Sequence, residues 1–133
     1  MAKEHKYHHS RIEIDTSLPV ERALNLATQT VETQRGVRLV DAGGEAVSAA
    51  ITNLLGGRLV HFTVKARQSG GMTRISTELV QYRTSQQTVF FIPVGPKSIE
   101  GYSVYRGYMR ALQQVVQAAD PSARCTITER EAA

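Results

Sequence analysis

The side chains best placed to contact a ligand are tyrosines that recur at helical spacing near the C-terminus. Tyr102 and Tyr105 begin a series spaced three or four residues apart, which share one face of a helix. The series continues with Met109, Leu112, Val116 and Ala119. A phenol buried without a hydrogen-bond partner costs about 1–3 kcal/mol. This face is therefore either a core whose phenols are satisfied or one wall of a cavity. Tyr108 falls off the series, and we expect it at the surface.

Apolar residues of the preceding strands would complete the wall of such a cavity. The predicted ligand-binding residues are Phe62, Val64, Phe90, Tyr102, Tyr105 and Met109. Together they would suit a hydrophobic or amphipathic small molecule held between a sheet and the C-terminal helix.

Residue types that carry catalysis or bind metals do not cluster in this sequence. Cys125 is the only cysteine, it has no histidine nearby, and no Gly-x-Ser-x-Gly elbow occurs. His5, His8 and His9 would suit a metal ion only on a helix, and no carboxylate joins them. His61 stands alone on the polar side of its strand, where we expect a surface histidine. The sequence thus names no catalytic residue, metal site or cofactor, and it favours a non-enzymatic role.

The start of the C-terminal helix is the one candidate anion site. Gly95-Pro96-Lys97-Ser98 ends like a phosphate-binding loop, but proline replaces the second glycine, which excludes nucleotide binding by such a loop. Lys97 and Ser98, with the free amides of the helix start, could bind an anion. The alternative is simple capping by Ser98, with Glu100 favoured by the helix dipole.

Alternating and helical patterns of apolar residues predict an α+β fold. Strands are expected over residues 11–15, 37–41, 46–53, 58–68, 72–83 and 88–94, with helices over 17–35 and 96–119. Gly36 would end the first helix, and Ser17 would cap it. Short connections require antiparallel neighbours. We therefore predict a single curved antiparallel sheet of about six strands, in the order strand, helix, five strands, helix, with the long C-terminal helix packed on the sheet.

Length and composition are those of one globular domain without a membrane span. The 133 residues are 41% apolar and 21% charged. No apolar run approaches the roughly 20 residues that cross a bilayer, and the N-terminus lacks an apolar secretory segment, so a cytoplasmic location is expected. Residues 1–10 are predicted as a disordered arm, 11–120 as the domain and 121–133 as a loose tail. Residues 125–128 of that tail could add a short edge strand.

The net charge of +4 is concentrated in the middle of the chain. From Arg58 to Arg83 the sequence has five basic residues and a single acidic one, Glu78. Such a region indicates either an anionic partner or a solvated sheet face. Aromatic residues do not alternate with these charges on the polar side, which argues against nucleic-acid binding by base stacking.

The opening Ile12-Glu13-Ile14-Asp15, the following Leu18-Pro19-Val20-Glu21-Arg22-Ala23-Leu24 and the terminal amphipathic helix resemble the SRPBCC superfamily. This is the helix-grip fold of the birch pollen allergen and START domains. The resemblance covers about residues 10–120 and implies a hydrophobic ligand between the sheet and the final helix. The chain would be a reduced member, without the second short helix, one strand and the tryptophan near Leu24. TATA-binding-protein-like folds share a similar element order, and no catalytic residue set carries over.

Two functions follow as hypotheses. The first is a non-catalytic protein that binds a hydrophobic or amphipathic small molecule. The alternative is a ligand-free interaction module that uses its basic sheet face (Lys65, Arg67 and Arg74) or a strand edge. Its partner would be an acidic protein, a nucleic acid or a second copy of the chain.

Overall fold

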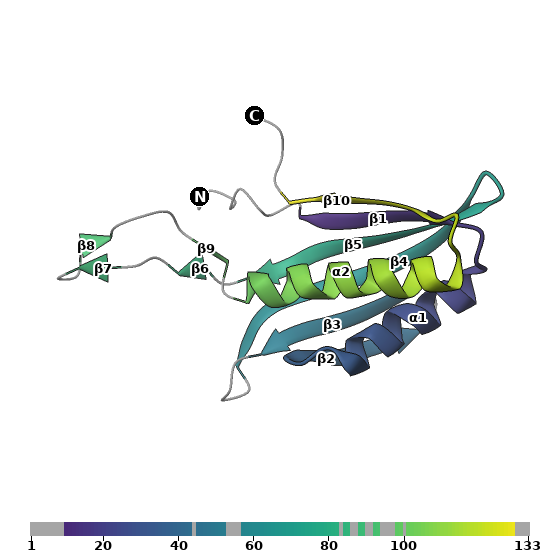
Figure 1. Ribbon diagram of the computed structural model, residues 1–133. Coiled ribbons are helices and arrows are strands. Elements are labelled where there is room, and N and C mark those ends of the chain that lie inside the picture. The colour runs from purple at the N-terminus through teal and green to yellow at the C-terminus, as the bar shows by residue number, and fades with distance from the viewer. Residues whose placement is uncertain are drawn as a thin grey trace.

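Two helices cover one face of a six-stranded antiparallel sheet (Figure 1). The computed structural model describes residues 10–43, 45–52, 57–82, 84–85, 88–89, 92–93, 98–99 and 101–129. The sheet comprises β1 (Arg11–Thr16), β2 (Val37–Gly43), β3 (Ala46–Thr52), β4 (Arg58–Ser69), β5 (Met72–Tyr82) and β10 (Arg124–Thr128), and the helices are α1 (Val20–Thr33) and α2 (Tyr102–Ala119). Its strand order is β10-β1-β5-β4-β3-β2, with every pair antiparallel. The predicted fold class, an α+β fold with one curved antiparallel sheet, is confirmed.

The sixth strand of the sheet is not the one predicted over residues 88–94. There, β7 (Thr88–Val89) pairs with β8 (Ile92–Pro93), and β6 (Thr84–Ser85) pairs with β9 (Ser98–Ile99), both outside the main sheet (Figure 1). The C-terminal β10 takes the sixth place, with Ile127 opposite Ile12 of β1. The strand β10 alternates half-buried and more exposed residues, as a strand with one face toward the core does. Of the two expectations for the tail, the edge strand is therefore correct.

Both helices begin later than the sequence suggested. Pro19 is the N-cap of α1, and Ser17 makes no capping bond. Gly101 is the N-cap of α2, so capping by Ser98 is wrong, because Ser98 lies in β9. Gly36 has the predicted left-handed conformation, with φ of 87°.

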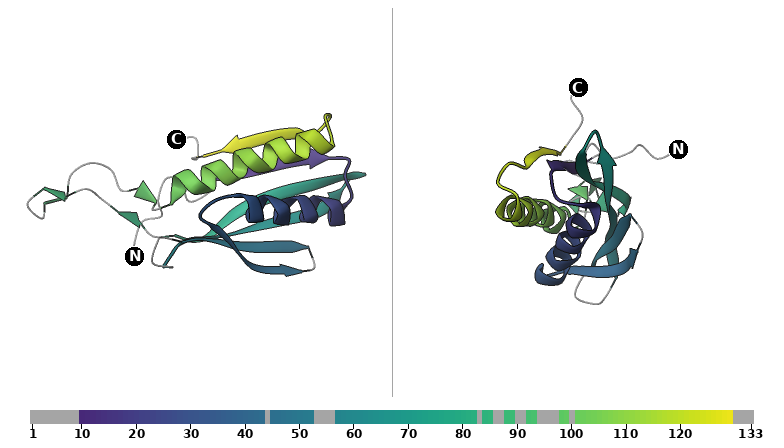
Figure 2. Two further views of the ribbon diagram at one scale, coloured as in Figure 1. Left: turned by 60° about the horizontal axis from the view of Figure 1, so that its bottom comes forward. Right: turned by 90° about the vertical axis from the view of Figure 1, so that its right-hand side faces the viewer.

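The core lies between the inner face of the sheet and the two helices, which run side by side over it (Figure 2). This arrangement gives α2 two buried sides, one against the sheet and one against α1. Tyr108, expected at the surface, is fully buried, and its hydroxyl donates to the Ala27 carbonyl of α1 at 2.9 Å. The expectation was wrong because the spacing within one helix does not reveal a second helix beside it.

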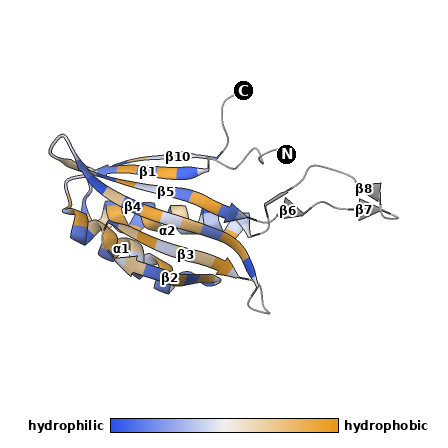
Figure 3. Ribbon diagram, turned by 180° about the vertical axis from the view of Figure 1, so that it is seen from behind, coloured by the Kyte–Doolittle hydropathy of each residue, from blue (hydrophilic) through white to orange (hydrophobic). Residues whose placement is uncertain are grey.

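No helix of the described residues lies on the outer face of the sheet (Figure 1). Seen from that side, β4 and β5 carry hydrophobic and hydrophilic residues in turn (Figure 3), and buried residues alternate with more exposed ones along most of both strands. This alternation is expected when one face packs on helices and the other meets water. No helix in the described part of the chain is long and apolar enough to cross a membrane.

Asp120 joins the end of α2 to the end of β1. Its Oδ2 accepts hydrogen bonds from the Thr16 hydroxyl at 2.6 Å and from the Ser17 amide at 3.0 Å. Its Oδ1 accepts from the hydroxyl and amide of Ser122, at 2.6 and 3.1 Å. These bonds, that of the Ser122 hydroxyl most of all, hold the pKa of Asp120 well below its usual range.

We expect Gly101→Ala to lower the free energy of unfolding by about 1–3 kcal/mol. Gly101 has φ of 80°, and a Cβ there would lie 2.9 Å from Ile51 Cγ2. The matched control is Gly107→Ala within α2, where a Cβ meets no atom within 4 Å. That substitution should raise stability by up to about 1 kcal/mol, because alanine favours a helix. Urea unfolding measures both, and equal stabilities of the two variants would contradict the account of Gly101.

The bonds to Asp120 also predict an acid-dependent loss of stability. A carboxyl group whose pKa is lowered by folding stabilises the native state above its unfolded pKa of about 3.9, and this contribution is lost as pH falls further. Urea midpoints of the wild type should therefore exceed those of Asp120→Asn at pH 7. The difference should shrink below about pH 4. A difference that is constant from pH 7 to the acid range would show that the charge of Asp120 has no part in it.

Candidate functional site

The strands β1 and β5 pair over only part of their length. Their ladder runs from Thr16 opposite Thr73 to Glu13 opposite Ser76. Beyond it, the amide of Ile12 donates to the side-chain oxygen of Thr77 at 3.0 Å. The two strands therefore part at this end, and a side chain of β5 occupies the space between them.

Tyr105 of α2 completes the hydrogen bonding at this parting. Its hydroxyl donates to the Ser10 carbonyl at 2.7 Å and lies 2.8 Å from Thr77 Oγ1. A phenol has one hydrogen, so Thr77 is the donor in the second bond. Ser10, Thr77 and Tyr105 are all at most 1% exposed, and burial raises the pKa of Tyr105. Ser10 thus belongs to the packed domain, although the sequence placed it in the N-terminal arm; residues 1–9 lie outside the described residues.

A second chain of hydrogen bonds starts at Ser10. The Ser10 hydroxyl lies 2.7 Å from the Tyr102 hydroxyl, which donates to Glu129 Oε1 at 3.2 Å. Since Tyr102 gives its only hydrogen to Glu129, Ser10 is the donor to Tyr102. Arg106 pairs with the same carboxylate, and its guanidinium lies 5.1 Å from the centre of the Tyr102 ring. The hydroxyls of Tyr102, like those of Tyr105 and Tyr108, therefore have partners within the protein.

The predicted ligand-binding residues that the structure describes lie in the core. Phe62, Val64, Tyr105 and Met109 are 0% exposed, and Tyr102 is 8% exposed. The Phe62 ring centre lies 5.1 Å from that of Tyr105. A ligand among them would have to displace packed side chains, and their role in binding stays a prediction.

The other predicted binding residues are not brought to this place by any described contact. Phe90 and Lys97 lie outside the described residues. Ser98 is part of β9, ahead of the helix whose start it was expected to form. The anion site of Lys97 and Ser98 stays a prediction as well.

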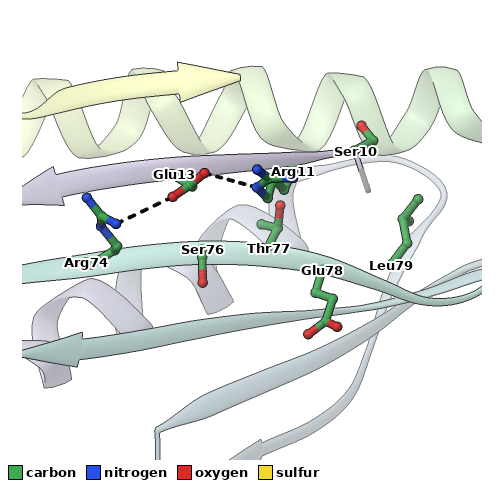
Figure 4. A pocket seen from close by; sticks show the side chains of 8 residues that line it. All are labelled: Ser10, Arg11, Glu13, Arg74, Ser76, Thr77, Glu78 and Leu79. Atoms are coloured by element: carbon green, nitrogen blue, oxygen red, sulfur yellow. Dashed lines mark hydrogen bonds and ion pairs between the residues drawn. The ribbon is translucent and has the colours of Figure 1, made fainter. Parts of the chain in front are cut away.

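A cavity of about 310 Å³ opens on the outer face of the sheet where β1 and β5 part (Figure 4). Its lining consists of Ser10, Arg11, Glu13, Arg74, Ser76, Thr77, Glu78 and Leu79. Ser10, Thr77 and Leu79 are at most 3% exposed. The cavity therefore reaches between the strands to buried groups, and we call it the β1–β5 cavity.

Charged side chains of both signs form the wall of the β1–β5 cavity. Glu13 lies between two guanidinium groups, with Arg11 Nε 3.0 Å from Oε1 and Arg74 Nη1 3.6 Å from Oε2 (Figure 4). Arg74 also binds both carboxylate oxygens of Asp15, at 2.9 and 3.2 Å, and this lowers the pKa of Asp15. Glu78 is 67% exposed and lies 3.7 Å from Lys65. The predicted basic face is thus partly neutralised by carboxylates of β1.

The remaining candidate groups do not form a metal site. Among the described residues, no three His, Cys, Asp or Glu side chains gather closely enough to hold a metal ion. His61 is half-buried on the outer face of β4, and its Nε2 has no hydrogen-bond partner in the described ranges. Thr63 Oγ1, two residues further along the same strand, is also buried and has no partner there.

Comparison with known proteins adds no assignment. No protein-family model matches the chain, and a search of curated proteins finds no significant match. The functional inference therefore depends on the geometry of the β1–β5 cavity.

We expect Tyr105→Phe to cost more stability than Tyr108→Phe. The first removes the donor to the Ser10 carbonyl and the acceptor for Thr77, leaving two buried groups unpaired. Its cost should be about 1–3 kcal/mol. The second removes a single bond to Ala27, which should cost about 0.5–1.5 kcal/mol. Urea unfolding compares the two, and a reversed order would show that Tyr105 does not hold the parted strands.

Proposed function

We propose that this chain is a small-molecule-binding protein whose site is the β1–β5 cavity. The observation that carries the proposal is a volume of about 310 Å³ that extends between two strands to buried groups. Ligand sites in proteins commonly measure about 300–1,000 Å³. This volume therefore suits a molecule at the small end of that range. The titratable groups of the wall are engaged in ion pairs, so we assign these residues to ligand binding rather than to proton transfer.

The chemistry of the floor supports a ligand whose inner end is a hydrogen-bond donor. Ser10 and Thr77 give their hydroxyl hydrogens to Tyr102 and Tyr105. Their remaining lone pairs can only accept, so an ammonium or hydroxyl group of a ligand complements them. Leu79 adds an apolar contact beside them.

The wall supports an acidic group at the outer end of the ligand. The guanidinium of Arg74 is 54% exposed at the mouth of the cavity and can share a further carboxylate. The carboxylate of Glu78, which lines the same cavity, favours a cationic rather than a neutral donor at the inner end. The proposed ligand is therefore amphipathic and carries both charges, as a free amino acid does. The resemblance to helix-grip proteins agrees with small-molecule binding, although in that family the ligand lies on the other side of the sheet.

A matched pair of tryptophan substitutions tests the proposal. Ser76 and Ser48 are half-buried serines, on β5 and β3. Of the two, Ser76 alone lines the cavity. A panel of free amino acids is titrated into the protein and followed by amide chemical shifts. Binding should shift the amides of Arg11–Glu13 and Ser76–Leu79, should be at least about tenfold weaker in Ser76→Trp and should be unchanged in Ser48→Trp.

Native mass spectrometry of freshly purified protein complements the titration. A bound small molecule that is lost in Ser76→Trp but retained in Ser48→Trp supports the site. The proposal is wrong if wild-type protein carries no bound molecule and none of the amino acids shifts these amides. It is also wrong if Ser76→Trp binds as the wild type does.

A further inference from the structure

The strand β2 forms one edge of the sheet, at the opposite side from β10 (Figure 1). Among the described strands it pairs with β3 alone, so the main-chain groups on its other side have no partner in those strands. All its residues from Arg38 to Gly43 are exposed. Leu39 and Val40 are 37% and 40% exposed, and they are neighbours. Unpaired main-chain groups beside exposed apolar side chains are the features by which one strand adds to another.

Two opposite charges flank this apolar pair in the sequence and share the outer face of the sheet, whereas Leu39 lies opposite the core residue Ala49 on the helix-covered face. Arg38 lies opposite Ala50 of β3, and Asp41 lies opposite Ser48. Ala50 and Ser48 are two residues apart on a regular stretch of β3, so they share a face. Arg38 and Asp41 share the outer face too, because a bulge between Leu39 and Asp41 inserts an extra residue.

Neither of these charges has a partner among the residues that the structure describes. Arg38 and Asp41 form no ion pair with the described part of the chain, unlike the linked arginines and carboxylates beside the β1–β5 cavity. Along the edge strand, the segment Arg38-Leu39-Val40-Asp41 therefore has the order cation, two apolar residues, anion, with the two charges on the outer face. In an antiparallel second copy the order is reversed, so that each Arg38 meets an Asp41. The segment is therefore complementary to a second copy of itself.

We propose that β2 pairs with β2 of a second copy of the chain, antiparallel about a two-fold axis near Leu39 and Val40. An axis perpendicular to the sheet keeps the two outer faces on one side. Arg38 of each copy then lies beside Asp41 of the other, and the apolar pairs cover each other. The two sheets join into one, and the unpaired main-chain groups of both edges gain partners.

The opposite edge is a poorer candidate for this contact. Its strand β10 has five residues, and none of the large apolar side chains that are exposed in the described residues belongs to it. Cys125 and Ile127 are half-buried toward the core instead. The comparison favours β2, where the exposed apolar residues and the unpaired charges coincide.

The size of the contact predicts its strength. One strand of seven residues buries less than the roughly 1,200–2,000 Å² of a stable interface. We therefore expect a reversible dimer with a dissociation constant of about 1–100 μM, which populates with increasing concentration. Opposite charges that face each other across strands strengthen pairing, and like charges oppose it.

Charge reversal at the two positions tests the proposal. In Arg38→Asp the two-fold contact brings carboxylates together, and in Asp41→Arg it brings guanidinium groups together. Each variant should dimerise at least about tenfold more weakly than the wild type in sedimentation-velocity experiments. The double variant R38D/D41R should recover the affinity. A mixture of the two single variants should form a one-to-one heterodimer, because each then supplies the charges that the other lacks.

The control is Arg67→Asp, which makes the same change of charge at an exposed position of the inner strand β4. Its self-association should match that of the wild type, and circular dichroism verifies that every variant is folded. A wild-type protein that stays monomeric at millimolar concentration would overturn the proposal. So would a dimer that neither reversal weakens, since its contact would then lie elsewhere.

Discussion

The hydrogen-bonding needs of the main chain at the start of β1 govern this structure. Where β1 leaves β5, the Ser10 carbonyl and the Ile12 amide are buried and must find partners other than a strand. The Tyr105 hydroxyl of α2 donates to the Ser10 carbonyl, and Thr77 Oγ1 of β5 accepts from the Ile12 amide. Because the two hydroxyls also bond to each other, the position of α2, the parting of the strands and the N-terminal boundary of the domain are coupled. A continuous ladder between these strands would have closed the β1–β5 cavity.

The sequence contains a signal for this arrangement, although the spacing of α2 alone conceals it. Inward positions of β5 alternate Thr73, Ile75, Thr77 and Leu79, so two polar residues point into an otherwise apolar layer. A buried hydroxyl needs a partner, and tyrosines at matching depth on the covering helix can provide one. The tyrosine face can be a core or a cavity wall, and the two interpretations differ only in whether the hydrogen-bond partners of the phenols belong to the protein or to a ligand. Their identity depends on which strands are neighbours, and local spacing does not encode that.

The sequence predicts elements well and neighbours poorly. The alternation in Arg58–Gln68 and the helical repeat after Tyr102 are local patterns, and both are present in the fold. Tyr108 was misplaced because its burial depends on α1, a separate element. The sixth strand was misplaced because residues 88–94 and Arg124–Thr128 are both short segments of a composition typical of strands, and only pairing with β1 distinguishes them. The basic middle of the chain was judged without Glu13 and Asp15, which the fold brings beside Arg74.

The two proposed surfaces lie on different parts of the sheet, and this separation has a consequence. β4 and β3 lie between the β1–β5 cavity and the β2 edge, so a second copy at that edge would leave the cavity open. A two-fold axis perpendicular to the sheet would place both cavities on the same outer face of the dimer. Occupancy of one cavity changes no residue of β2, and dimer formation changes no residue that lines the cavity. Ligand binding and dimerisation are therefore expected to be independent. Coupling would require the ligand to make different contacts in the monomer and in the dimer, and the β2 edge contributes no contact to the cavity.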